Sequence, residues 1–111
     1  MDCILHIGSN KTGTTFLQNS LARNREALAP HGLAYPEAGC NFARQTLDRQ
    51  AGLRFAMTPD ALPLGGLAWQ FGLEAPGARA RYRTRFIAEL YTGLAALPRD
   101  TTVILSVEAL F

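Results

Sequence analysis

Three stretches of this 111-residue chain show a clear pattern of apolar positions. Cys3 to Ile7 is a continuous apolar run apart from His6, which is typical of a buried parallel strand covered on both faces. Thr102 to Ser106 predicts a second buried strand beside the first. Between Gly77 and Leu97, apolar residues recur every three or four positions and predict a long helix, packed across both strands from Tyr82 onward. The pattern therefore indicates an α/β fold built on a parallel sheet.

Weaker patterns cover the remainder of the chain. An apolar stripe at helical spacing predicts a helix from Thr14 to about Leu28, ended by Pro30 and Gly32. The other predicted elements are a short strand at Leu33–Tyr35, a helix at Asn41–Gln50 and a loop at Thr58–Gly66. Two aromatic residues follow in a stretch without periodicity, which favours packing in a lid or core over stacking on a sugar: Trp69 and Phe71.

The junction between the first strand and the first helix has the composition of an anion-binding loop. Gly8 and Gly13 permit backbone angles closed to other residues, so the chain between them can curl and turn its N–H groups inward. The following helix adds unpaired N–H groups and the positive end of its dipole. Thr14 and Thr15 add hydroxyl groups, and Lys11 adds a positive charge. The junction therefore predicts a site for phosphate or sulfate.

The spacing departs from that of the common phosphate loop. Four residues separate Gly8 from Gly13, as that pattern requires, but Thr14 occupies its lysine position and the lysine lies at Lys11. Lys-Thr-Gly-Thr-Thr resembles the 5′-phosphosulfate loop of sulfotransferases. The longer string from His6 to Gln18 is similar to the sulfotransferase-like family that acts mainly on carbohydrates. Gly-Leu-x-Tyr-Pro up to residue 36 and Ser-x-Glu at 106–108 continue the resemblance.

The resemblance implies an enzyme that transfers a sulfuryl group from 3′-phosphoadenosine 5′-phosphosulfate to a hydroxyl group of a small molecule or a glycan. Lys11 would neutralise charge on the bridging oxygen and the 5′-phosphate as the sulfuryl group leaves. Glu108 is the candidate general base for the attacking hydroxyl, with a surface helix-capping carboxylate as the equal alternative. The pattern requires no metal ion. The residues that would bind the donor are Ser9, Asn10, Lys11, Thr12, Gly13, Thr14 and Thr15.

The resemblance also implies a domain organisation. Residues 1–111 would form the amino-terminal part of one P-loop-type domain, a three-layer fold with a parallel sheet and helices on both faces. In the family, the 3′-phosphate site uses an Arg and a Ser on a later strand and helix, and this sequence ends before such a strand. We therefore expect the fold to be incomplete. The isolated chain is expected to be marginally stable, to associate through an open sheet edge, or to depend on residues beyond Phe111.

Composition excludes several classes of protein. A hydrophobic content of 48% with 18% charged residues indicates a globular chain rather than a disordered one. The net charge of +2 is too small to indicate binding to nucleic acid, and no apolar run reaches the roughly 18 residues of a membrane span. Cys3 and Cys40 have no histidine pattern to complete a metal site, which favours a reducing compartment. Asp2 stands where a signal peptide would be basic, so a cytoplasmic location is expected.

Several residues have a second interpretation. His6 is expected to be a neutral core histidine bonded to backbone, the alternative being a side chain beside the bound anion. A solvated helix end is favoured over an anion-binding patch for the four arginines Arg79, Arg81, Arg83 and Arg85. Two other functions remain open: a nucleotide kinase-like phosphotransferase in which Glu108 holds a metal ion, and a non-catalytic anion-binding module.

Overall fold

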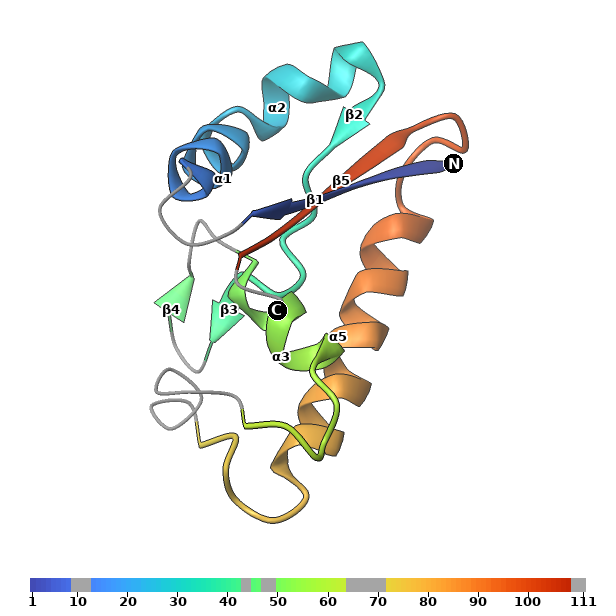
Figure 1. Cartoon of the computed structure of the whole chain (residues 1–111). Coiled ribbons are helices and arrows are strands. Elements are labelled where there is room, and N and C mark those ends of the chain that lie inside the picture. Colours follow the sequence, from blue (N-terminus) through green and yellow to red (C-terminus); the bar gives the residue numbers. More distant parts are fainter. Residues whose placement is uncertain (9–12, 43–44, 47–49, 64–71, 109–111) are drawn as a thin grey trace.

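A three-stranded parallel sheet runs through the centre of the protein, with the strand order β1–β5–β2 (Figure 1). The structure is a computed structural model that describes residues 1–8, 13–42, 45–46, 50–63 and 72–108. The three strands are β1 Asp2–Gly8, β2 Leu33–Ala34 and β5 Thr102–Glu108. The predicted α/β class and the parallel pairing of the two apolar strands are both confirmed.

Helices lie on both sides of this sheet (Figure 1). On one side lie α1 (Thr14–Arg23) and α2 (Arg25–Leu28), followed by a 3-10 turn at Ala29–His31. On the other side lie α3 (Ala51–Met57) and α5 (Ala78–Ala95). The long helix expected between Gly77 and Leu97 is thus confirmed as α5.

The first helix is shorter than the apolar stripe predicted, because it is interrupted at Asn24. The side-chain amide of Asn24 donates a hydrogen bond to the Ser20 carbonyl at 2.6 Å, and its backbone N–H bonds the carbonyls of Ser20 and Leu21. Asparagine competes with helical hydrogen bonding in this way, so it ends one helix and precedes the next. Gly32, with a φ of +71°, then turns the chain into β2.

The predicted helix at Asn41–Gln50 is wrong. Asn41–Phe42 (β3) and Gln45–Thr46 (β4) pair as a small antiparallel ribbon, and α3 begins only at Ala51. Gln50 is the residue before α3, and its side chain is held by bonds to distant parts of the chain, so tertiary contacts decide the structure here. The predicted loop after Thr58 is confirmed as far as Pro63, and Trp69 and Phe71 lie outside the described residues.

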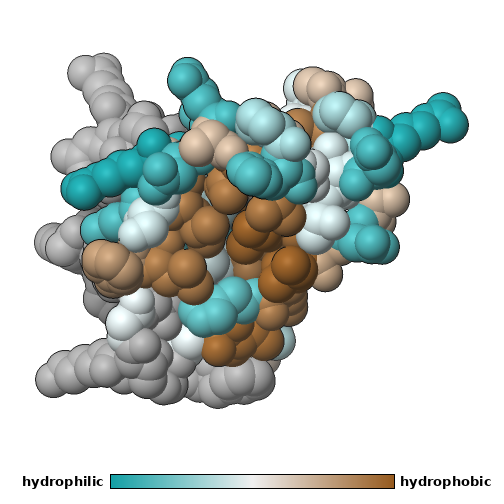
Figure 2. All heavy atoms as spheres, turned by 90° about the horizontal axis from the view of Figure 1, so that it is seen from above, coloured by the Kyte–Doolittle hydropathy of each residue, from teal (hydrophilic) through white to brown (hydrophobic). Residues whose placement is uncertain are grey.

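The expectation that β1 is covered on both faces is also wrong. β5 is the central strand and buries Val103 and Val107, whereas β1 pairs with β5 along one edge and no other described strand pairs with it. Cys3 is exposed, and Ile4, Leu5 and Ile7 expose 41–52% of their surface. Seen from above, apolar side chains form a continuous area across the middle of the molecule (Figure 2).

The core lies where α3 and α5 pack together against the carboxyl half of β5. α5 was expected to cross both apolar strands, but it packs chiefly on α3, and α3 lies against β5. Burial in this core raises the pKa of the Tyr82 phenol above its usual range. The buried cluster consists of Ala38, Leu53, Phe55, Leu73, Tyr82, Phe86 and Val107.

Two glycines, Gly39 before α3 and Gly52 in its first turn, allow the start of α3 to pack closely against the preceding segment and the core. The N–H of Gly52 donates to the carbonyl of Gly39 at 2.9 Å, and Gly39 has a φ of +83°. A methyl group on Gly52 would overlap the Tyr82 hydroxyl and lie 2.8 Å from the Gly39 Cα. Because these neighbours include backbone, the contact requires glycine at position 52.

Two of the four arginines of α5 are structural anchors and not a solvated helix end. Arg83 donates to the carbonyls of Ala56 and Thr58 and to the Asp60 carboxylate at 2.9 Å, and this bond lowers the pKa of Asp60. Arg79 donates to three carbonyls in the same loop, those of residues 59, 60 and 62. The two guanidinium groups lie one helical turn apart and tie α5 to the end of α3. Arg85 instead lies over the Tyr82 ring, 5.4 Å from its centroid.

We expect Gly52→Ala to lower the free energy of unfolding by about 2–3 kcal/mol, because the added methyl group overpacks a contact bounded by backbone. Gly93→Ala is the matched control: it lies in the exposed part of α5 with nothing within 4 Å of the new methyl group. This control should stabilise the protein by about 0.5–1 kcal/mol. Urea unfolding of the two variants measures both values, and equal effects would contradict the close approach.

Candidate functional site

The carboxyl ends of β1 and β5 lie side by side at one edge of the sheet. Gly8, the last residue of β1, pairs with Glu108, the last residue of β5. α1 begins at Thr14, so five residues connect β1 to the helix. Ligands of open α/β sheets bind outside the carboxyl ends of the strands, which makes this edge the candidate site.

The amino end of α1 is suited to an anion. Gly13 precedes the helix with a φ of +82°, a left-handed conformation that other residues adopt at a cost. Because glycine has no side chain, this position cannot supply the hydroxyl or carboxylate that commonly caps a helix. The first turn contains no acidic residue either. Its N–H groups and the helix dipole therefore favour an external anion.

The predicted site residues fall partly within the described structure. Gly13, Thr14 and Thr15 stand at the start of α1, and Glu108 stands at the end of β5. The backbone thus brings the start of the loop and the candidate base to the same edge of the sheet. The predicted donor-binding residues Ser9, Asn10, Lys11 and Thr12 lie outside the described residues.

Beneath this edge, the backbone of Ser106 is bonded by two glutamine side chains. The N–H of Ser106 donates to Gln50 Oε1 at 2.8 Å, and its carbonyl accepts from Gln18 Nε2 at 3.1 Å. β2 ends at Ala34, which is opposite Val103, so β5 continues beyond the strand that would otherwise bond these groups. The glutamines take the place of the missing strand, and both are almost fully buried.

The Ser106 side chain connects the same point to β1. Its hydroxyl lies 3.0 Å from Nδ1 of His6, the residue directly opposite on β1. His6 was expected to bond backbone within the core, but it is half-buried and its partner is a side chain. Since His6 is two residues before Gly8, this bond holds the two strands together just below the loop.

Gln18 and Gln50 were not recognised from the sequence as support for the site. Gln18 is the last residue of the motif, but the motif does not indicate that its side chain bonds Ser106. Gln50 falls in the segment wrongly predicted as helix. One signal in the sequence indicated that such support would be needed, namely that the strand predicted before Pro36 is short. A short β2 leaves the carboxyl half of β5 without a strand partner on the β2 side. Among the described residues, Gln18 Oε1 has no hydrogen-bond partner although it is buried.

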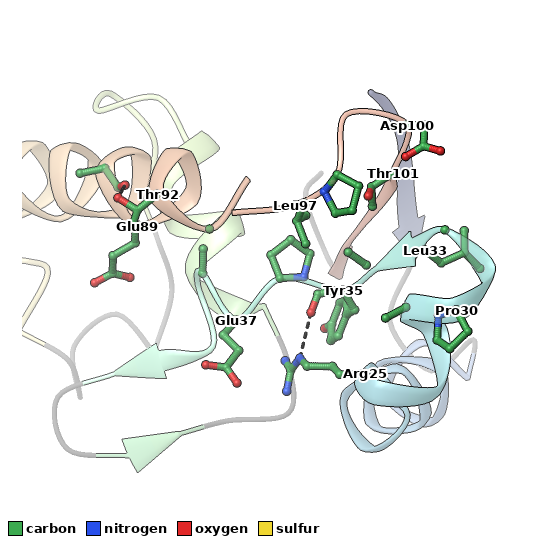
Figure 3. Close-up of a pocket in the computed structure, with 18 of the residues that line it drawn as sticks. Arg25, Pro30, Leu33, Tyr35, Glu37, Glu89, Thr92, Leu97, Asp100 and Thr101 are labelled. Carbon is green, nitrogen blue, oxygen red and sulfur yellow. Dashed lines mark hydrogen bonds between the residues drawn. The ribbon is translucent and has the colours of Figure 1, made fainter. Parts of the chain in front are cut away.

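A separate groove of about 980 Å³ runs between β2 and α5 (Figure 3). Arg25 forms part of its wall, donating to the Tyr35 carbonyl at 2.8 Å and lying 5.1 Å from the centroid of the Tyr35 ring. Glu37 and Glu89 also line the groove. Neither Gly8 nor Gly13 lines it, so the groove is distinct from the amino end of α1.

The described residues contain no group of three or more His, Cys, Asp or Glu side chains placed to hold a metal ion. Within the same residues, no helix is both long and apolar enough to cross a bilayer. Comparisons with protein-family models, with curated proteins and with solved structures found no match to this chain.

We expect Gln50→Leu to lower the free energy of unfolding by about 3 kcal/mol, because it leaves the Ser106 N–H and the Pro36 carbonyl without their buried partner. Gln18→Leu is the matched control, since it removes one bond and also an unpartnered buried oxygen. Its cost should be about 1 kcal/mol or less. Chemical denaturation of both variants tests the difference, and a larger loss for Gln18→Leu would contradict the assignment.

Proposed function

We propose that the protein is a sulfotransferase that transfers a sulfuryl group from 3′-phosphoadenosine 5′-phosphosulfate to a hydroxyl acceptor, with glycans as the favoured acceptor class. The proposal rests on the Lys-Thr-Gly-Thr-Thr string, which follows β1 and runs into the first turn of α1. The observation that carries it is the pairing of Gly8 with Glu108, because it sets the start of that loop beside the end of β5.

The amino end of α1 would bind the 5′-phosphate of the donor. Its uncapped N–H groups and the absence of acidic residues in the first turn support this role. The hydroxyls of Thr14 and Thr15 would add further donors. Since the phosphate is a leaving group that gains negative charge, fixed donors aimed at it stabilise the transition state more than the ground state.

Lys11 would neutralise the charge that develops on the bridging oxygen. The acceptor oxygen forms a bond to sulfur while the bond from sulfur to the bridging oxygen breaks, and adenosine 3′,5′-bisphosphate leaves. Glu108 would take the proton of the attacking hydroxyl, a role supported by its backbone position opposite Gly8. Positioning of the reactants and neutralisation of charge account for most of the rate enhancement in such group transfers.

Lys11 is the only lysine in the sequence, which allows a direct test of donor binding. An amine-acylating reagent should modify Lys11 and the Met1 α-amino group, and mass spectrometry distinguishes the two. Adenosine 3′,5′-bisphosphate should protect Lys11 while the Met1 amine reacts as before. Equal acylation of Lys11 with and without the nucleotide would contradict the proposed site.

Lys11→Ala should lower sulfuryl transfer by the full protein about 100-fold or more while the fold stays intact, because it removes the charge that stabilises the leaving group. Arg99→Ala is the control, since it removes one positive charge from an exposed position outside the site. Steady-state kinetics with a labelled donor provide the measurement. Unchanged turnover in Lys11→Ala would reject the catalytic role of this lysine.

The donor itself distinguishes the proposal from a kinase-like phosphotransferase. Adenosine 3′,5′-bisphosphate should bind more tightly than ATP, and its affinity should not change when magnesium is removed with a chelator. Titration calorimetry with both nucleotides, with and without magnesium, measures this. Stronger, magnesium-dependent binding of ATP would favour phosphoryl transfer, and donor binding without turnover would indicate a binding module.

A further inference from the structure

His6 is a half-buried histidine just below the strand ends of the proposed anion site. It stands two residues before Gly8, so its Cα lies about 7 Å from that of the last residue of β1. Its Nδ1 lies 3.0 Å from the hydroxyl of Ser106, and the side chain of Gln18 in α1 bonds the carbonyl of the same serine. His6 is therefore connected to the helix of the anion site through a single residue.

The partner of His6 suits both protonation states of an imidazole. A hydroxyl group donates to a neutral ring nitrogen and accepts from a protonated one, whereas a backbone carbonyl can only accept. Ser106 is fully buried, and Gln50 and Gln18 hold its backbone N–H and carbonyl. Because His6 itself is only half-buried, it can exchange protons with solvent. The gain of a proton therefore keeps the bond to Ser106 and requires no shift of the strands.

Few charged residues belong to the elements around His6. Asp2 stands four residues earlier on β1, and Glu108 is the last residue of β5. The first charged residue of α1 is Arg23, at the far end of that helix. Within the described part of the chain, His6 forms no ion pair with any of them. A positive charge on His6 is therefore available to attract a bound anion.

We propose that the anion site takes up a phosphate or sulfate group together with a proton, and that His6 carries this proton. The inference rests on the proposed function for the place of the anion, at the amino end of α1. Gln18 is the fifth residue of α1, about 6 Å along the helix from the first, so the imidazole lies roughly 10 Å from an anion held there. At this distance an imidazolium changes the dissociation constant of a doubly charged anion about fourfold, even with the dielectric constant of water.

The direction of the pH dependence follows from the charge of the imidazole. An imidazole gains its positive charge as the pH falls through the range between about 8 and 5. The attraction is therefore present at the acidic end of this range and is lost as the pH rises. By reciprocity, a bound anion favours the charged form of His6 to the same extent.

Inorganic sulfate is the probe, because it keeps its double charge across this range, whereas a phosphate group gains a proton near pH 6. At low ionic strength, where screening is weak, sulfate should bind the wild-type chain at least threefold more tightly at about pH 6 than at about pH 8. His6→Gln keeps a polar group for Ser106 but removes the charge, so its affinity should be equal at both pH values. Titration calorimetry measures these affinities.

His31→Gln is the matched control and should keep the pH dependence of the wild-type chain. His31 is exposed and precedes Gly32, whose carbonyl accepts from the N–H of Thr102 at the amino end of β5. It therefore lies at the opposite end of β5 from Ser106.

Proton NMR of the wild-type chain provides a test that requires no substitution. The chain contains two histidines, so their ring signals report the charge of each. At about pH 6.5, sulfate should raise the protonated fraction of His6 and leave that of His31 unchanged. Sulfate binding with the same pH dependence in the wild-type chain and in His6→Gln would overturn this inference but not the proposed function. No sulfate binding at either pH would reject the anion site and the inference together.

Discussion

The arrangement depends on how the backbone of Ser106 is satisfied where β5 extends past β2. An unpaired N–H and carbonyl buried at this point would each cost about 1–3 kcal/mol. Gln50 supplies the acceptor and Gln18 the donor, one from the segment before α3 and one from α1. These bonds set both helices against the central strand, so the hydrogen bonding of one residue connects the two helical layers with the sheet.

The same point supports the candidate site. His6 bonds the Ser106 hydroxyl two residues below Gly8 and Glu108, and Gln18 fastens α1 a little over one turn from its amino end. The strand ends and the helix terminus are thereby held in fixed positions relative to one another. Anion binding by a helix terminus requires such support, because donors that had to be reorganised would stabilise a transition state poorly.

The core is displaced to one side of the sheet. The approach of Gly52 to Gly39 brings α3 into contact with Tyr82 and Phe86, and the carbonyl bonds of Arg79 and Arg83 fasten α5 to the loop after α3. The central strand is covered as a result, while β1 remains partly exposed.

Local patterns were enough to predict the strands β1 and β5 and the helix α5. Each of these depends on spacing within one segment, either a run of apolar residues or a helical repeat. The failed prediction at Asn41–Gln50 and the break at Asn24 mark places where side chains bond carbonyls or amides that spacing does not reveal.

Only the tertiary structure decided which polar side chains support the site. Gln18 and Gln50 bond Ser106 across separations of 88 and 56 residues, and Arg79 and Arg83 bond carbonyls 17 and 27 residues earlier. It also decided that, among the described strands, β1 lies at the edge of the sheet and β5 at its centre. Apolar periodicity reports which face of a segment is buried, but a buried polar group takes whichever partner the fold brings within reach.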